Sequence, residues 1–142
     1  MLRKRTQSTQ EKRRILIVDD HPLVRRGLAA LINAEPDLIV CAEAATRADG
    51  LVAIAVTRPD LVITDLSLIH GDGLELVRDI RSRHVEMRVL VLSLHDSPLY
   101  VRRAFAAGAD GYLAKQKLTE ALLPAIRSVL RGEAYGTPPE LT

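Results

Sequence analysis

Leu61-Val62-Ile63-Thr64-Asp65 is the stretch that decides the fold. Four apolar or β-branched residues are typical of a buried strand, and the aspartate that follows must lie at the sheet edge because an isolated charge is costly to bury. Two other runs end in the same way: Ile15-Leu16-Ile17-Val18 precedes Asp19 and Asp20, and Val89-Leu90-Val91-Leu92 precedes Ser93. If these strands are parallel, their polar ends meet on one edge of the sheet. Open parallel sheets bind ligands at that edge, where the strand order reverses.

The composition favours a single α/β domain. A chain of 142 residues can bury one proper core but leaves no room for a second full domain. Its residues are 47% hydrophobic but only 3% aromatic, which suits the aliphatic strands of a buried parallel sheet. The single cysteine, Cys41, excludes an internal disulfide and offers no basis for a cysteine-ligated metal site. No apolar run is long enough to cross a membrane, so we expect a cytoplasmic protein that does not bind membranes.

The net charge of +2 is unevenly distributed. Six basic residues against Glu11 give the first fourteen residues a charge of +5, so the remainder carries +2 − 5 = −3. The segment 1–13 has no apolar periodicity, and we expect a disordered basic tail there. A solvated leader is favoured over a tail that contacts nucleic acid or membrane. Because the remainder is slightly acidic, we expect no direct binding of nucleic acid by this chain.

Alternating apolar patterns predict five β/α units. The strands are expected at 14–18, 37–42, 61–65, 88–92 and 111–114, and a helix follows each of them. Five such units predict a right-handed, doubly wound, three-layer sandwich with a five-stranded parallel sheet, in the flavodoxin-like order 2-1-3-4-5. Pro124 lies beyond the first turn of the last helix, expected at 119–130, and removes a backbone hydrogen bond there. We therefore expect a late start or a kink in that helix.

The converging polar residues suggest a cation site. Asp19, Asp20 and Asp65 on one edge would repel each other, which favours either a protonated carboxyl group or a bound cation. Hard oxygen ligands suit Mg²⁺, which keeps waters and can accept a phosphate oxygen as a ligand. Ser93 and Lys115 add a hydroxyl and an ammonium group, which could hold a phosphoryl oxygen once it is attached to a carboxylate.

Each of these residues has a simpler interpretation when taken alone. An aspartate at a strand end is often a turn or cap residue, Ser93 could satisfy backbone groups, and Lys115 could be a solvated surface charge. Five such residues at the same ends of predicted parallel strands are hard to assign to accident. His21, His70 and His95 lie on loops of the same edge, but their spacing matches no recognised zinc pattern and the oxygen-rich set favours magnesium. His95 could instead influence the access of water to a phosphorylated site.

From Arg14 to about Gly132 the chain resembles the receiver domain of two-component response regulators. The resemblance rests on five segments in combination: Ile15–Pro22, Asp60–Leu68, Asp72–Leu76, Val89–Ser93 and Ala107–Lys115. His21-Pro22 after the acidic pair, Arg25-Arg26-Gly27-Leu28, and Gly132-Glu133-Ala134-Tyr135 resemble the subfamily whose receivers precede a LuxR-type helix-turn-helix domain.

The resemblance implies a role for each matching position. Asp65 would be the phosphoacceptor, which takes a phosphoryl group from a phosphohistidine on a sensor histidine kinase. Asp19, Asp20, Asp65 and the backbone carbonyl of Ser67 would hold Mg²⁺. Ser93 would be the switch hydroxyl, Lys115 the ion-pairing lysine, and Tyr112 the aromatic residue whose rotamer follows Ser93. The resemblance further implies a shift between two states, read on the surface around the fourth helix, fifth strand and fifth helix, with a homodimer on activation as one option. Without the resemblance, Tyr112 is better interpreted as a packing residue of an edge strand.

Ile69 departs from the family pattern, which usually has proline four residues after the phosphoacceptor. Proline would restrict the backbone beside the metal-binding carbonyl, so its absence is expected to loosen that loop. We hypothesise altered kinetics with retained chemistry; an unchanged phosphoryl lifetime in Ile69→Pro would contradict this.

The sequence therefore predicts a signalling switch with self-catalysed phosphotransfer and dephosphorylation, not a turnover enzyme. One alternative is a pseudo-receiver that binds proteins without being phosphorylated. Another is a phosphohydrolase with an aspartate nucleophile, but such enzymes generally have a second aspartate where this chain has Ser67. We expect a receiver at 14–132 and a linker at 133–142. By this interpretation the linker leads to an absent DNA-binding output domain that regulates transcription, and a free-standing receiver is the alternative.

Overall fold

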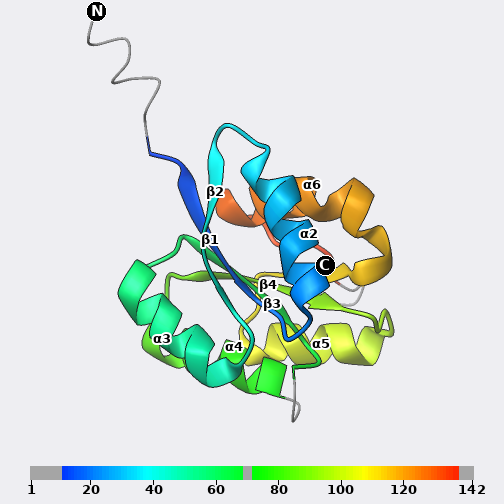
Figure 1. Cartoon of the computed structure of the whole chain (residues 1–142). Coiled ribbons are helices and arrows are strands. Elements are labelled where there is room, and N and C mark those ends of the chain that lie inside the picture. The colour runs from blue at the N-terminus through cyan, green and yellow to red at the C-terminus, as the bar shows by residue number, and fades with distance from the viewer. Residues whose placement is uncertain (1–10, 69–71, 138–142) are drawn as a thin grey trace, which may run out of the picture.

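The computed structural model describes residues 11–68 and 72–137, and within them five parallel strands form one sheet (Figure 1). The sheet order is β2-β1-β3-β4-β5, which confirms the predicted topology. The strands are β1 (Arg13–Val18), β2 (Leu38–Ala44), β3 (Leu61–Asp65), β4 (Arg88–Ser93) and β5 (Gly111–Ala114). Because β1 leads to β2 on one side and β3 lies on its other side, the order reverses between β1 and β3. The ends of these two strands therefore flank the position where such sheets bind ligands.

Helices cover both faces of the sheet, as the three-layer prediction requires (Figure 1). One face carries α2 (Pro22–Asn33) and α6 (Leu118–Leu130), and the other carries α3 (Arg47–Thr57), α4 (Asp72–Arg83) and α5 (Pro98–Ala107). A short 3₁₀ helix, η2 (Lys115–Lys117), joins β5 to α6.

The aliphatic strand residues are divided between two cores. Ile15 and Ile17 of β1 pack with α2 and α6, while Leu16 and Val18 pack on the opposite face. Successive side chains of a strand point to opposite faces, so a strand covered on both sides must be apolar at every position. This is why the strands appear in the sequence as continuous aliphatic runs instead of alternating patterns.

Local signals set several helix ends. Thr46 caps α3, its hydroxyl accepting a hydrogen bond from the Asp49 N–H at 3.1 Å, and Ser97 caps α5 in the same way through the Leu99 N–H at 3.2 Å. Gly108 ends α5 with a φ of 118°, which L side chains rarely adopt. These helix ends are therefore set by residues close to them in the sequence.

The observed bounds of β1, β2, β4 and α6 differ from the expected ones by one or two residues. β2 continues to Ala44 because its pairing with β1 extends to Val18 opposite Ala44, and β4 includes Ser93, which pairs with Ala114. α6 begins at Leu118, so the late start proposed for Pro124 is wrong. Pro124 lies on the exposed side of this helix, and the alternative of a kink stays a prediction.

Several expectations fall on residues 1–10, 69–71 and 138–142, which lie outside the described residues. These include most of the basic tail, Ile69, His70 and the end of the predicted linker. Within the described ranges, no helix is both long and apolar enough to span a membrane. Tyr135, inside the segment predicted as linker, accepts a hydrogen bond from the Tyr112 N–H at 2.9 Å and so lies along the edge of β5.

Candidate functional site

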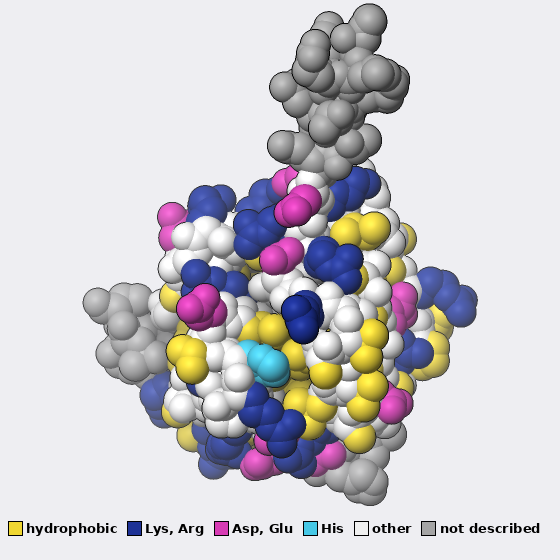
Figure 2. Space-filling view, turned by 90° about the vertical axis from the view of Figure 1, so that its left-hand side faces the viewer, with side chains coloured by type: hydrophobic (Ala, Val, Ile, Leu, Met, Phe, Trp, Pro, Cys, Tyr) yellow, Lys and Arg dark blue, Asp and Glu magenta, His cyan; other side chains and the backbone are white. Residues whose placement is uncertain are grey.

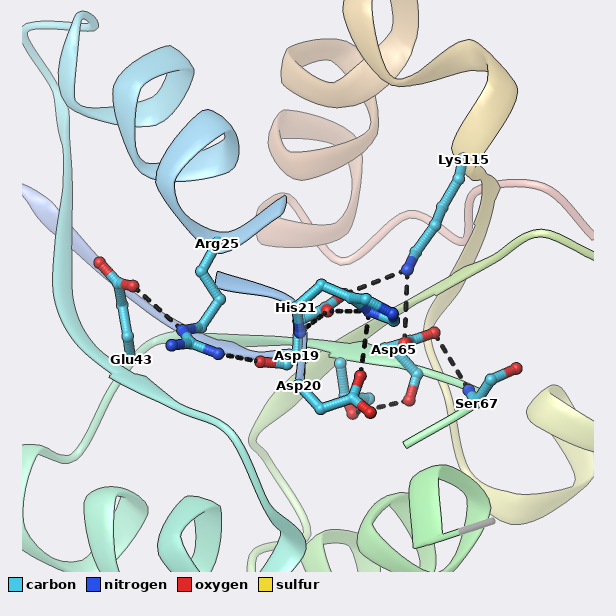
Figure 3. A network of polar contacts seen from close by, with 9 residues as sticks. Asp19, Asp20, His21, Arg25, Glu43, Asp65, Ser67 and Lys115 are labelled. Atoms are coloured by element: carbon cyan, nitrogen blue, oxygen red, sulfur yellow. Dashed lines mark hydrogen bonds and ion pairs between the residues drawn. The ribbon is translucent and has the colours of Figure 1, made fainter. Parts of the chain in front are cut away.

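Three carboxylates meet at the carboxyl ends of β1 and β3 (Figure 3). In the register of these strands Val18 lies opposite Thr64, so the residues that follow, Asp19 and Asp65, are neighbours. Their exposed fractions are only 1% and 2%. One potential ligand atom from each of Asp19, Asp20, His21 and Asp65 lies within 4.8 Å of the others. The structure thus brings the three predicted aspartates together.

The two oxygens of Asp65 have different surroundings. Oδ1 accepts a hydrogen bond from the Ser67 N–H at 3.0 Å, whereas Oδ2 accepts none and has the Lys115 ammonium at 3.3 Å as an ion-pair partner. The loop after Asp65 is held against the start of α4, where a Cβ on Gly73 would lie 2.5 Å from the Asp65 carbonyl oxygen. Any other residue at position 73 would push this backbone away, so the glycine permits the close approach.

Both the main chain and the side chain of Asp19 are fixed by hydrogen bonds. Its N–H donates to the Ala44 carbonyl at 3.0 Å, its Oδ1 accepts from the His21 N–H at 2.8 Å, and its Oδ2 accepts from Lys115 Nζ at 3.1 Å. Lys115 comes from the end of β5 and is only 10% exposed, so it bridges two buried carboxylates that are far apart in the sequence. This contact confirms the expected proximity of Lys115 to the acidic residues.

The site has more negative than positive charge. Counted at their formal charges, the three carboxylates and one ammonium sum to −3 + 1 = −2. The His21 ring, 63% exposed, places Nδ1 3.1 Å from a carboxylate oxygen of both Asp19 and Asp20. Coulomb repulsion between carboxylates at such separations is large in a partly buried site, and a divalent cation would relieve it.

The donor set fits Mg²⁺. Among the described residues, Asp20 Oδ1 and Asp65 Oδ2 are the buried side-chain atoms that lack a hydrogen-bond partner. Two nearby carboxylate oxygens without a hydrogen bond are suitable ligands for a hard cation. A zinc site is less suited, because a single imidazole accompanies the three carboxylates and His95 is not part of the cluster. His70 lies outside the described residues, and no contact supports or opposes the Ser67 carbonyl as a ligand.

Ser93, Tyr112 and His95 form a second group beside the carboxylates. Ser93 is fully buried and its Oγ accepts a hydrogen bond from the His95 N–H at 2.9 Å. The Tyr112 hydroxyl donates to the His95 carbonyl at 2.5 Å, while the His95 ring stacks on Tyr100 with 4.3 Å between ring centroids. Burial raises the pKa of the Tyr112 phenol, and the nearby Ser93 hydroxyl opposes this shift. Tyr112, 5% exposed, is therefore an inward-facing neutral phenol near the predicted switch hydroxyl.

Two residues of the network were missed by sequence reasoning. Arg25 of α2 donates from Nη1 to the Asp19 carbonyl oxygen at 2.5 Å, and its Nε lies 3.4 Å from Glu43 Oε1 on β2 (Figure 3). No local pattern could have revealed this contact, because it depends on how α2 packs beside β2.

Comparison with known proteins shows the family of the chain. The response regulator receiver domain family matches residues 15–127. The chain belongs to this family. The receiver is 34% identical over 132 residues to the transcriptional regulatory protein DegU of Brevibacillus brevis, covering 93% of this chain and 56% of that protein. It is 36% identical over 126 residues to the nitrate/nitrite response regulator NarL of Escherichia coli K12, covering 89% of this chain and 58% of NarL. The receiver thus spans a little over half the length of these relatives.

Solved structures support the same assignment. A LuxR-family two-component response regulator from Aurantimonas sp. SI85-9A1 superposes with a TM-score of 0.85 at 36% identity, covering 92% of this chain and 93% of that one. The receiver domain of a NarL regulator from Mycobacterium tuberculosis gives a TM-score of 0.81 at 32% identity, covering 87% and 99%. The predicted resemblance to receivers of LuxR-type regulators is confirmed. The family is a signalling domain, so neither the phosphohydrolase nor the pseudo-receiver is favoured.

Proposed function

We propose that Asp65 is the phosphoacceptor of this receiver and that the donor is a phosphohistidine on a sensor histidine kinase. A carboxylate oxygen of Asp65 forms a bond to phosphorus while the bond from phosphorus to the imidazole nitrogen breaks, and the imidazole keeps the electron pair of that bond. The observation that carries the proposal is the Asp65 carboxylate: it is buried, one of its oxygens lacks a hydrogen-bond donor, and Lys115 lies 3.3 Å away.

Each residue of the site has a separate part in this proposal. Mg²⁺ held by Asp19, Asp20, Asp65 and the Ser67 carbonyl would neutralise charge on the incoming phosphoryl group. Lys115 holds an ammonium beside the acceptor before the phosphoryl group arrives, so little reorganisation is needed during transfer. Ser93 supplies a hydroxyl from the neighbouring strand, because Asp65 pairs with Leu92 and Ser93 follows directly. The chain would thus catalyse its own phosphorylation and dephosphorylation.

We propose that the switch passes through the loop after β4. Ser93 Oγ and the Tyr112 hydroxyl both bind the main chain of His95, one at its N–H and the other at its carbonyl. If the Ser93 hydroxyl turns toward a phosphoryl oxygen, its hydrogen bond from the His95 N–H breaks. The loop can then rearrange, and the Tyr112 side chain can change its conformation with the loop. This sequence of changes would alter the surface formed by α5, β5 and α6.

For the partners of the whole protein we propose what the names of its relatives suggest. Several relatives are named transcriptional regulatory proteins, and others are described as LuxR-family or DNA-binding response regulators. We propose that this receiver likewise controls a DNA-binding domain, and that phosphorylation favours a homodimer. DNA-binding surfaces are usually basic, so we expect the basic DNA-binding surface to lie on that domain and not on the receiver.

The decisive experiment is incubation with a small phosphodonor and Mg²⁺, followed by intact mass. We expect one phosphoryl increment on the wild type and none on Asp65→Ala. Asp60→Asn is a matched control because it changes an aspartate at the opposite end of the same strand, and it should keep the increment.

Other outcomes would reject the proposal. A wild type that never gains the increment would indicate a pseudo-receiver, and continuous release of phosphate with fast turnover would indicate a hydrolase. An increment that persists in Asp65→Ala would place the acceptor elsewhere.

A further inference from the structure

We infer that Arg25 is a positioning residue that aims the metal-binding carboxylate of Asp20. This inference rests on the proposed function, since it gives Arg25 and Glu43 a part in building the same Mg²⁺ site. Arg25 makes no hydrogen bond or ion pair with Asp20 or Asp65, and its polar contacts among the described residues are with the Asp19 carbonyl and Glu43. Its effect is exerted through the main chain of Asp19 (Figure 3).

The contact falls on one particular peptide group. The Asp19 carbonyl oxygen, the Asp19 Cα, and the nitrogen and Cα of Asp20 lie in a single plane, because the peptide bond is rigid. Arg25 Nη1 donates to that oxygen at 2.5 Å. The Asp19 N–H, on the preceding peptide group, is held by the Ala44 carbonyl at 3.0 Å. The peptide group after Asp20 is held as well, because the His21 N–H donates to Asp19 Oδ1 at 2.8 Å. With the peptide groups on both sides of Asp20 fixed, the direction of its Cα–Cβ bond is largely set.

The two aspartates depend on this arrangement to different degrees. Asp19 also has hydrogen bonds from His21 and Lys115 to its side chain, so several contacts define its position. Asp20 Oδ1 accepts no hydrogen bond, and its ion-pair contact is with the mostly exposed His21 ring. Asp20 must therefore be aimed chiefly by its backbone. Loss of Arg25 should affect Asp20 more than Asp19.

Glu43 provides the second polar contact of the Arg25 guanidinium. Its Oε1 lies 3.4 Å from Arg25 Nε, so a guanidinium on α2 is held between a carboxylate on β2 and the carbonyl after β1. A planar guanidinium can contact both at once, whereas a lysine ammonium can reach only one of them well. Arg25 is only 20% exposed, which limits the screening of these contacts by solvent.

The charge of Arg25 and its positioning role predict opposite results. A positive charge near the site weakens the attraction of a cation, so if Arg25 acted only as a charge, its removal would tighten Mg²⁺ binding. If Arg25 positions Asp20, its removal should weaken binding, and loss of a residue that orients metal ligands typically costs roughly tenfold or more in affinity. The direction of the change therefore separates the two effects.

The test is titration of the isotope-labelled receiver with MgCl₂ alone, followed through the amide resonances of residues 19–21 by NMR. We expect the dissociation constant to rise about tenfold in Arg25→Met, less in Arg25→Lys, and about threefold in Glu43→Gln. Arg26→Met is the matched control: it removes the same charge from the exposed neighbouring position on α2 and should leave the dissociation constant within about twofold.

The outcomes distinguish this inference from the proposed function. A wild type whose amide resonances do not respond to Mg²⁺ would reject both. A wild type that binds Mg²⁺, with Arg25→Met binding equally or more tightly, would overturn the role of Arg25 alone. Should Arg25→Met not fold, as shown by loss of amide dispersion, Glu43→Gln and Arg25→Lys decide, and unchanged affinity in both rejects the inference.

Discussion

The carboxylates at the two ends of the sheet have different hydrogen-bond partners. At the carboxyl end, Asp20 and Asp65 each keep a buried oxygen without a hydrogen-bond donor. At the amino end, Asp60 Oδ2 accepts from the Arg14 N–H at 2.7 Å and lies 3.7 Å from Arg13 Nε. Asp37 and Glu35 are bound by the guanidinium of Arg127.

Of two hollows lined by described residues, one at each end of the sheet, the larger is nevertheless at the amino end. A cavity of about 590 Å³ is lined there by Arg13, Asp60, His84, Met87 and Arg88, among others. Figure 2 shows a face with hydrophobic side chains around a histidine in a hollow and basic side chains nearby. A smaller hollow of about 300 Å³ lies at the carboxyl end, near the proposed phosphoacceptor, against Ser67, His95 and Tyr100. The size of a hollow therefore does not point to the proposed site. The buried carboxylate oxygens without a hydrogen bond do point to it, because folding alone would not favour them.

The largest expected effect follows from removing Lys115. Lys115→Met leaves Asp19 and Asp65 buried without their shared cation, so the free energy of unfolding without Mg²⁺ should fall by about 3 kcal/mol. Phosphorylation by a small donor should slow by roughly 100-fold. Urea denaturation and timed intact mass measure the two quantities.

Lys117→Met is the control, since Lys117 is an exposed residue of the same 3₁₀ helix. If Lys115→Met and Lys117→Met are equally stable, the buried ion pairs contribute nothing and the contrast between the two ends disappears.

A smaller effect of opposite sign at the two ends is expected for aspartate-to-asparagine changes. Asp65→Asn removes a repelling charge and supplies an amide donor, so it should stabilise the metal-free protein by about 1 kcal/mol. Asp60→Asn loses an exposed ion pair and a charged acceptor, so it should destabilise by about 0.5 kcal/mol.

Urea denaturation in the presence of a metal chelator measures both changes. Destabilisation by Asp65→Asn would mean that its carboxylate contributes to the fold as Asp60 does, which would contradict the comparison.

The smallest effect on stability is expected at low pH and involves a carboxylate at the amino end of the sheet. The hydrogen bond from Arg127 lowers the pKa of Asp37 below its ordinary value of 3.8. A carboxyl group with a lowered pKa in the folded state stabilises the fold above its unfolded pKa, and this contribution is lost as the pH falls through the folded value. Stability of the wild type should therefore decline more steeply below about pH 4 than that of Asp37→Asn.

Thermal unfolding between pH 2.5 and 6 tests this, and the effect is small because the Asp37 side chain is 56% exposed. Parallel curves for the two proteins over that range would show that the ion pair with Arg127 does not stabilise the fold.

Much of the fold could be predicted from single segments. The aliphatic runs ending in Asp19, Asp65 and Ser93 identified three strands, and the helix ends at Thr46, Ser97 and Gly108 have capping residues of the usual types. These signals are local: side-chain periodicity follows from backbone geometry, and a cap depends on residues two or three positions away. Pro124 was misleading for the start of α6, because a helix that buries Ala121, Leu122, Ala125, Ile126 and Val129 can retain a proline on its exposed side.

The contacts that shape the site could not be predicted in this way. Arg25 meets Glu43 and the Asp19 carbonyl only because α2 packs beside the first two strands, and Tyr135 lies along β5 after the chain has passed through α6. Asp19, Asp65 and Lys115 could be placed at one edge from the sequence, but the individual oxygens without a hydrogen-bond donor could not be identified in that way.

By itself, the sequence determined the parallel sheet, its two buried faces and the acidic edge, since these depend on residue type and spacing along the chain. Only the tertiary structure decided which carboxylate oxygen faces an ammonium, which accepts a backbone N–H and which has neither. Those differences arise from distances of a few ångströms between strands and helices far apart in the sequence, and electrostatic energies change steeply over such distances.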